Sequence, residues 1–447
     1  MLATSSKYSG QRHAILGMGT SGMAAARLAR RLGAEVTLLD DGEAARLEAG
    51  AKTAREEGFT VFTGPEALTG GGGFDLAVLS PGIDPSWPLA RRMAEAGVPR
   101  ISEIEFAAQQ SPVPIIAVTG TNGKTTTTGL IAHLLNSSGR RTVPCGNYGR
   151  ALADVVLADD PLDVLTVEVS SFQLELIDTF QPRVSVWMNF APDHLDRHPS
   201  LEAYRAAKLR IFERQSPSDT AVINGAETYP PLAARPVTFS AWRQDTDWTY
   251  ESGIIRHHGQ AVIALADTPL RGRHNAENIM AALAAVTAWG VPLESLPPLL
   301  ASFAPPRHRC EPVGTVQGRE FLNDSKATNP HAMESALRGQ EQPVVLIAGG
   351  KQKGLDYTPA LPLIAEKTSH VFTIGEIGPA LAECWASAAP CVPCASLEEA
   401  VSRAFAAAAP GQSILFAPGT SSFDMFTSYA HRGDVFRQIV QQLPTMP

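Results

Sequence analysis

The chain has 447 residues, of which 44% are hydrophobic and 18% are charged, a balance typical of a globular protein with about three domains. Its 45 acidic and 37 basic residues give a formal net charge of −8, and no run of lysine or arginine indicates a nucleic-acid or membrane surface. The sequence opens without a secretory signal core and holds no apolar stretch near the ~20 residues that span a bilayer, so we expect a cytoplasmic protein.

Residues 12–40 predict a strand, a glycine turn, a helix and a second strand. The segment "FDLAVLSPGI" (74–83) adds a buried strand, and the alternation predicts a small doubly wound α/β domain. Its turn, "GMGTSG", matches G-x-G-x-x-G, with Asp40 at the end of the next strand. Read alone, the turn favours a dinucleotide, but it would hold any diphosphate, including that of a UDP-sugar.

The stretch "PIIAVTGTNGKTTTTG" (114–129) predicts a strand, a phosphate-binding turn and the start of a helix. It departs from G-x-x-x-x-G-K-[ST], because Val118 stands where the first glycine would be. The shorter spacing still allows phosphate binding. Gly120 and Gly123 let the backbone approach phosphate oxygens, Lys124 adds a positive charge, and Thr125 offers a hydroxyl to Mg²⁺. The predicted nucleotide-binding residues here are Gly120, Thr121, Asn122, Gly123, Lys124, Thr125 and Thr126.

Glu168 lies inside an apolar strand, "TVEVSS", where an unpartnered carboxylate would be costly to bury. We expect Mg²⁺ as its partner, the alternative being an edge strand that leaves Glu168 in solvent. The loop "NFAPDHLDRH" concentrates Asp193, His194, Asp196 and His198 after another strand. No H-E-x-x-H pattern accompanies the two histidines, so one histidine near a cation is favoured over a zinc site.

Two helices of the central part carry further candidates. The helix predicted over 200–215 has Ser200 as its N-cap, and Lys208 looks like part of its solvated face. Asn275 and Asn278 lie at the start of another helix, where they could cap the helix or hydrogen-bond to the edge of an adenine. The composition does not distinguish these two roles.

The last part of the chain alternates again, with strands predicted at "REFLNDS", "PVVLIAGG", "HVFTIGE" and "QSILFAPG" and a closing helix at "FRQIVQQL". The predicted fold is therefore α/β in three domains. They are a Rossmann-like domain over 1–102, a central P-loop ATPase-like domain with a mostly parallel sheet over 103–305, and a second Rossmann-like domain over 306–447.

With these pieces in order, essentially the whole chain resembles the Mur ligases. The resemblance rests on "TGTNGKTTT", "EVSSFQLE", "PDHLDRH", "YRAAKLRIF", "NDSKATNP" and "SSFDMFTSYAHRG". The Ser-Phe-Gln segment and the last two stretches look specific to the D-glutamate-adding member. The resemblance implies an ATP-dependent ligase that joins D-glutamate to UDP-N-acetylmuramoyl-L-alanine through an acyl phosphate in peptidoglycan precursor synthesis, and a monomer. The alternatives are another Mur ligase or a folylpolyglutamate-type ligase and, from other classes, a dehydrogenase or a nucleotide-gated binding protein.

The resemblance also implies roles position by position. Lys124, Thr125 and Glu168 would hold the ATP phosphates and a first Mg²⁺. His194 and an N-carboxylated Lys208 would bind a second Mg²⁺, so Lys124, His194 and Lys208 form the implied catalytic set. The implied contacts to the adenosine and phosphates of ATP are Asn275, Asn278, Arg309 and Asp324.

For the two acceptors, the resemblance implies one set each. D-glutamate would be held by Thr328, Lys353, Ser422 and Tyr429, and the UDP-sugar by Thr20, Ser21, Asp40, Ser80 and Asn147. The chain departs from the family pattern at two places. Asp41-Gly42 stand where Thr-Arg can follow Asp40, and Lys351 offers an alternative alignment to Lys353.

Overall fold

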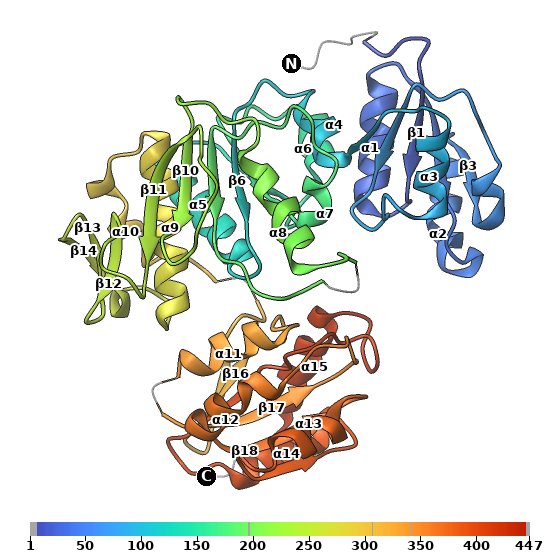
Figure 1. Cartoon of the computed structure of the whole chain (residues 1–447). Helices are drawn as coiled ribbons and strands as arrows, with labels where there is room; N and C mark the ends of the chain where they lie inside the picture. The colour runs from blue at the N-terminus through green and yellow to red at the C-terminus, as the bar shows by residue number, and fades with distance from the viewer. Residues whose placement is uncertain (1–6, 195–196, 306, 341, 444–447) are drawn as a thin grey trace.

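A computed structural model describes residues 7–194, 197–305, 307–340 and 342–443, so Asp196 lies outside the described part. Figure 1 shows three α/β units: the N-terminal unit (blue) lies beside one end of the central unit (cyan to yellow), and the C-terminal unit (orange to red) lies against another side of it. Each unit has its own sheet. The predicted α/β class with three domains is confirmed, and the proposed domain limits at 102 and 305 stay predictions.

The N-terminal sheet is entirely parallel, in the order β3-β2-β1-β4-β5. The order reverses between β1 and β4, and ligands of such sheets bind beyond the carboxyl ends of the strands at that point. The predicted glycine turn follows β1 there. The elements are β1 Arg12–Leu16, α1 Thr20–Arg31, β2 Glu35–Asp40, α2 Ala44–Glu56, β3 Thr60–Thr63, β4 Leu76–Leu79, α3 Pro88–Glu95 and β5 Arg100–Ser102.

Nine strands form the central sheet in the order β14-β13-β12-β11-β10-β9-β6-β8-β7, parallel except for the antiparallel β12–β14. Helices α5 and α9 pack on each other and against the strands from β8 to β12. The strands are β6 Ile115–Thr119, β7 Pro144–Gly146, β8 Leu165–Glu168, β9 Val184–Trp187, β10 Thr220–Asn224, β11 Arg235–Ser240, β12 Trp248–Glu251, β13 Ile254–His257 and β14 Gln260–Ala264. The helices are α4 Glu103–Ala108, α5 Lys124–Ser137, α6 Leu152–Ala158, α7 Ser171–Leu174, α8 Leu201–Leu209, α9 Arg273–Trp289 and α10 Pro297–Leu300.

The helix predicted over 200–215 is too long. Ser200 is its N-cap, because its hydroxyl accepts the N–H of Ala203 at 3.2 Å. The α-helix ends at Leu209 and tightens into one 3₁₀ turn, Arg210–Phe212. Gly290 ends α9 as expected, in the left-handed conformation.

The C-terminal sheet has the order β15-β16-β20-β17-β18-β19, and only the β15–β16 pair is antiparallel. All four predicted strands are present, and β15 and β19 were not predicted. The elements are β15 Glu311–Val316, β16 Arg319–Asn323, α11 Pro330–Arg338, β17 Val344–Gly349, α12 Leu361–Lys367, β18 Thr368–Ile374, α13 Gly378–Trp385, β19 Cys391–Pro393, α14 Leu397–Ala407, β20 Ser413–Phe416 and α15 Tyr429–Gln442.

Helix α4, which directly follows β5 of the N-terminal unit, bonds the rest of the central unit through two buried carboxylates. Glu103 Oε1 accepts the N–H of Ala153, in the first turn of α6, at 2.7 Å. Glu105 accepts the backbone N–H groups of Thr179 and Phe180, both at 2.9 Å. Among the described residues, no helix is long and apolar enough to cross a membrane.

Candidate functional site

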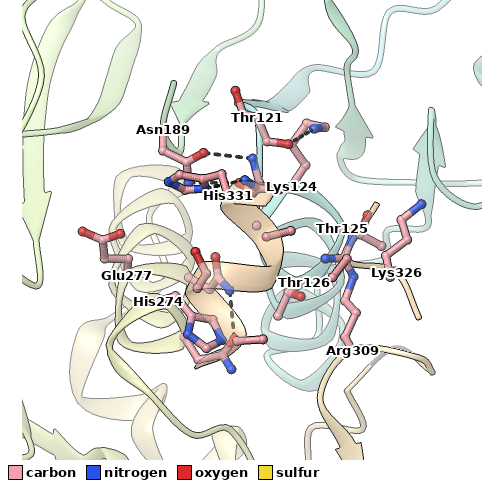
Figure 2. Close-up of a pocket in the computed structure, with 18 of the residues that line it drawn as sticks. Thr121, Lys124, Thr125, Thr126, Asn189, His274, Glu277, Arg309, Lys326 and His331 are labelled. Atoms are coloured by element: carbon pink, nitrogen blue, oxygen red, sulfur yellow. Dashed lines mark hydrogen bonds between the residues drawn. The ribbon is translucent and has the colours of Figure 1, made fainter. Parts of the chain in front are cut away.

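A cavity of about 650 Å³ lies where the central and C-terminal units meet. Figure 2 shows side chains from both units facing it, among them Lys124 of the central unit and His331 of the C-terminal unit. The structure therefore brings together residues far apart in the sequence. The predicted site residues that line it are Thr121, Asn122, Gly123, Lys124, Thr125, Thr126, Asn147, Glu168, His194, Asn275, Asn278, Arg309, Asp324, Thr328 and Lys353.

The predicted phosphate turn lies between β6 and α5. Gly120 and Gly123 have φ of 143° and 81°, a region that side chains strain, and a Cβ on Gly123 would lie 2.3 Å from Asn278 Oδ1. No side chain in the described part of the chain caps the N-terminus of α5. Its first backbone N–H groups are therefore available to an anion in the cavity.

Two lysines bond this turn: Lys124 is half-buried and lines the cavity, and Lys208 is buried. Lys124 Nζ donates to the carbonyl oxygens of Gly120 and Thr121, both at 2.8 Å. Lys208, on α8, is 1% exposed and donates to the same Gly120 oxygen at 2.8 Å. Burial lowers the pKa of Lys208 well below its ordinary value, and the charge of Lys124 lowers that pKa further. The interpretation of Lys208 as part of a solvated helix face is wrong.

Glu168 ends β8, which lies between β6 and β7, so the edge-strand alternative is also wrong. Its side chain is 2% exposed. Asn147 Nδ2 donates to Oε1 at 2.8 Å, while Oε2 is buried without a hydrogen-bond partner among the described residues. An ionised oxygen in that position is costly unless a cation neutralises it, so the residues present fit a divalent ion.

His194 follows β9 with a φ of 56°, beside Asp193. Burial lowers the pKa of His194 to about 4 although Asp193 raises it, so the ring is neutral and able to bind a metal. His198 points elsewhere: its Nε2 lies 3.0 Å from Ser171 Oγ, so the two histidines form no zinc pair. In the described part of the chain, no three His, Cys, Asp or Glu side chains cluster as a metal site. A cation here would take its other ligands from a nucleotide or from water.

Asn275 and Asn278 do not cap α9, whose N-cap is Gly272. Asn275 Nδ2 donates to the carbonyl oxygen of Arg271 at 2.8 Å, and Asn278 Nδ2 donates to Asn275 Oδ1 at 2.9 Å. Because both side chains line the cavity, the capping alternative is wrong.

Contacts across the cavity join the C-terminal unit to the central one. Lys353 Nζ lies 3.2 Å from Asp193 Oδ1, and Asn329 Nδ2 donates to Asp193 Oδ2 at 2.8 Å. Lys351 is exposed and outside the cavity, which favours Lys353 in the alignment. His331 Nδ1 lies 2.7 Å from Asn122 Nδ2.

Sequence reasoning missed Asn189, Asn329 and His331. Asn189 lies two residues after β9 ends at Trp187, and its Oδ1 accepts the Asn122 N–H at 2.9 Å. A polar side chain at the end of a buried parallel strand is a signal that could have found it. His331 had no such signal, because its partner lies in another unit.

Other predicted residues lie outside the cavity. Ser422 is buried, and the Tyr429 ring centroid lies 3.8 Å from the Nζ of Lys326, which does line the cavity. The N-terminal set gathers at the glycine turn after β1: Asp40 accepts the N–H groups of Met18 at 2.9 Å and Gly42 at 3.1 Å. The members of that set are Thr20, Ser21, Asp40 and Ser80, whereas Asn147 lies in the cavity beside Glu168.

Comparison with known proteins identifies the family. Family models of the Mur ligase middle domain and of the Mur ligase glutamate ligase domain match residues 118–286 and 308–420. A UDP-N-acetylmuramoylalanine–D-glutamate ligase of Desulfitobacterium hafniense is 40% identical to the chain, over 96% of the chain and 97% of that protein. The chain belongs to the Mur ligase family.

Solved Mur ligases share the fold at low identity. UDP-N-acetylmuramate–alanine ligase MurC of Thermotoga maritima has a TM-score of 0.62 and 19% identity, covering 97% of this chain and all of that one. The MurF ligase of the same organism, in complex with ADP, has a TM-score of 0.59 and 16% identity, covering 98% of this chain and 96% of that one. The three-unit architecture is thus that of the Mur ligase family.

Proposed function

We propose that this Mur ligase uses ATP to add D-glutamate to UDP-N-acetylmuramoyl-L-alanine in peptidoglycan precursor synthesis, and the D. hafniense relative is named for the same two acceptors. The observation that carries the chemistry is the cavity between the units. It joins an uncapped helix N-terminus, an unpartnered carboxylate oxygen and lysines from two units. Two anionic substrates need such local cations, since the chain as a whole is acidic.

ATP would bind with its phosphates on the turn from Gly120 to Thr126 and at the α5 N-terminus. Asn275, Asn278, Arg309 and Asp324 would contact its adenosine and phosphates, since all four line the same cavity. Lys124, already held at the turn, would face the transferred phosphoryl group.

Thr125 and Glu168 would hold one Mg²⁺, and His194 with an N-carboxylated Lys208 would hold a second. Such ions would neutralise charge on the phosphoryl oxygens. Carboxylation suits Lys208, because a buried amine with a lowered pKa carries a free electron pair. Its Nζ would attack CO₂ and lose a proton, giving an anionic carbamate.

The reaction has two steps. A carboxylate oxygen of the muramoyl-alanine attacks the γ-phosphorus of ATP. The bond from this phosphorus to the oxygen that bridges the β- and γ-phosphates breaks, so that ADP departs and an acyl phosphate is formed. The amine of D-glutamate then attacks the acyl carbon, phosphate leaves with the bonding pair, and the nitrogen loses a proton. Positioning and electrostatics provide most of the rate in such transfers.

The two acceptors would enter the cavity from different units. Thr328, Lys353, Ser422 and Tyr429 of the C-terminal unit would hold D-glutamate. The UDP-sugar would bind along a path from the N-terminal turn to the cavity, through Thr20, Ser21, Asp40, Ser80 and Asn147. We further propose that the enzyme acts as a monomer in the cytoplasm.

The test is phosphate release from ATP with UDP-N-acetylmuramoyl-L-alanine and each of several amino acids in turn. D-glutamate should support release, and L-glutamate, D-alanine and diaminopimelate should not. Release with another amino acid would indicate another Mur ligase, and release with a folate acceptor would indicate a folylpolyglutamate-type enzyme. ATP binding without acceptor-dependent release would indicate a binding protein, and reduction of a nicotinamide cofactor would indicate a dehydrogenase.

A further inference from the structure

Arg197 joins the N-terminal unit to the central unit at a nearly buried position. Its Nε lies 2.8 Å from Asp84 Oδ2 in the N-terminal unit, and its Nη2 lies 2.8 Å from Glu175 Oε2 in the central unit. Nη2 also donates to the carbonyl oxygen of Ile83 at 3.3 Å. The Arg197 side chain is only 10% exposed. Such a contact stabilises the structure more than a surface ion pair does, because the two arginine nitrogens that bond the carboxylates are shielded from water.

On one side, this contact reaches the segment that closes over the glycine turn after β1. Asp84 and Ile83 follow Ser80, whose N–H donates to Leu16 at 3.0 Å and whose own carbonyl accepts the Ile83 N–H at 3.0 Å. Ser80 Oγ lies 3.4 Å from the Gly17 carbonyl oxygen. A shift of Asp84 therefore moves the residues next to the proposed UDP-sugar site.

On the other side, the contact reaches the loop that carries His194. The Arg197 guanidinium lies 4.6 Å from the Phe172 ring centroid, and that ring meets the His194 ring edge-on at 4.9 Å. Glu175 Oε1 lies 3.4 Å from His198 Nδ1. Phe172 lies on α7, which directly follows β8 and Glu168.

We propose that Arg197 is a positioning residue, which fixes the N-terminal unit and the sugar-linked carboxylate relative to the phosphoryl-transfer site. The proposal rests on the proposed function for its substrate. Arg197 touches no reacting atom in this account; it acts through Asp84 on one unit and Glu175 on the other. Together with the packing of α1 on α4 and α6, it holds the N-terminal unit at two separate places.

The physical reason is the distance over which the acceptor must be aligned. A nucleotide-sugar held by one unit presents its carboxylate to a phosphorus held by another, so any rotation between the units displaces the attacking oxygen. Misplacement by about 1 Å can cost about 100-fold in rate. An ion pair across the boundary resists that rotation without contacting either substrate.

The test compares Arg197→Lys and Asp84→Asn with Arg214→Ala. Arg214 is the matched control, because it is an arginine of the central unit that bonds Asp178 of the same unit and is 52% exposed. We expect kcat/KM for the UDP-sugar to fall by about tenfold or more in both test variants, while the dissociation constant of ATP stays within about twofold. The control should match the wild type.

In the double variant Asp84→Asn/Arg197→Lys, kcat/KM for the UDP-sugar should fall no further than in the worse single variant, because each change breaks the same ion pair between Asp84 and Arg197. Additive losses, or equal loss of ATP affinity, would overturn the proposal and indicate a general structural role. Hydrogen exchange without ligands gives a readout independent of turnover: the amides of Ser80 and Ile83 should exchange faster in both test variants than in the control. Unchanged exchange there would overturn the proposal even if the wild-type enzyme proved to prefer another acceptor.

Discussion

Lys124 and Lys208 donate to one acceptor, the carbonyl oxygen of Gly120, each at 2.8 Å. Burial lowers the pKa of both amines, and the charge of Lys124 lowers that of Lys208 in addition. Two ammonium groups around a single oxygen in a buried place are unfavourable, so the pair favours one cation and one free amine. This division agrees with the proposed roles, in which Lys124 meets phosphate and Lys208 is carboxylated.

Lys124→Ala should abolish ADP formation, with a loss of at least about 100-fold in kcat, because the phosphoryl charge loses its nearest protein cation. A coupled assay for ADP with both acceptors present measures it. Lys52→Ala, which removes a lysine whose side chain is 76% exposed, is the control. Activity that survives within about tenfold, a barrier change of only ~1.4 kcal/mol, would contradict the phosphate role.

Lys208→Arg should lower kcat by roughly 100-fold, as expected when the support of a metal is removed. Arginine keeps a positive charge and forms no carbamate. With ¹³C-labelled bicarbonate, the wild type should give a carbamate resonance that the variant lacks. Lys367→Arg, at a lysine that does not line the cavity and donates to the Gln340 carbonyl oxygen, should keep both the resonance and the rate. An equal rate in the Lys208→Arg variant would rule out carboxylation as a requirement.

Glu168→Gln should weaken Mg²⁺ binding in the presence of ATP by about 10–100-fold. Without Mg²⁺ the variant should be at least as thermally stable as the wild type, because glutamine places no negative charge at this buried position. Magnesium titrations by calorimetry and thermal shift check both statements. The comparison variant is Glu56→Gln, at a side chain that is 66% exposed. A Mg²⁺ affinity unchanged by Glu168→Gln would show that the ion is held elsewhere.

Glu103→Gln should change how stability depends on pH. Burial raises the pKa of Glu103 from 4.5 to about 7, so the native state binds its proton more tightly than the unfolded state. The unfolding free energy of the wild type should therefore fall as the pH rises from about 4.5 through about 7, by an amount on the order of 3 kcal/mol. The variant carries no titrating group there, so its melting temperature should fall less between about pH 5 and about pH 8.

The same measurement on Glu95→Gln, at a side chain that is 69% exposed, should follow the wild type. Parallel curves for Glu103→Gln and the wild type would mean that Glu103 titrates normally in the folded protein.

Much of the fold follows from local patterns. Apolar runs that end at glycine turns located the parallel strands β1, β4, β6 and β17, because buried parallel strands are apolar on both faces. The antiparallel β12–β14 segment was not predicted, although its turns were readable. Ser252-Gly253 and His258-Gly259 all have positive φ, as two-residue hairpin turns require, but serine and histidine are weaker signals there than asparagine.

The site residues also fall into those that could be predicted from the local sequence and those that could not. The phosphate turn and Glu168 were predictable from residues, since both depend on their own strand and its neighbours. Lys208 was not, because its acceptor on Gly120 is 88 positions away and helix periodicity does not say which element covers a face. Asn329 and His331 likewise depend on how the C-terminal unit meets the central one.

The close approach of Gly123 to Asn278 limits how this enzyme can diverge. With 2.3 Å between Asn278 Oδ1 and a Cβ built at position 123, any larger residue there must displace the Asn278 side chain and adopt a φ of 81°. Randomising position 123 should thus yield glycine in nearly all active clones, and joint randomisation with 278 should not relieve this constraint, because the backbone conformation at 123 still favours glycine. An inhibitor that reaches between these two residues would meet a surface on which single-step resistance is hard to evolve.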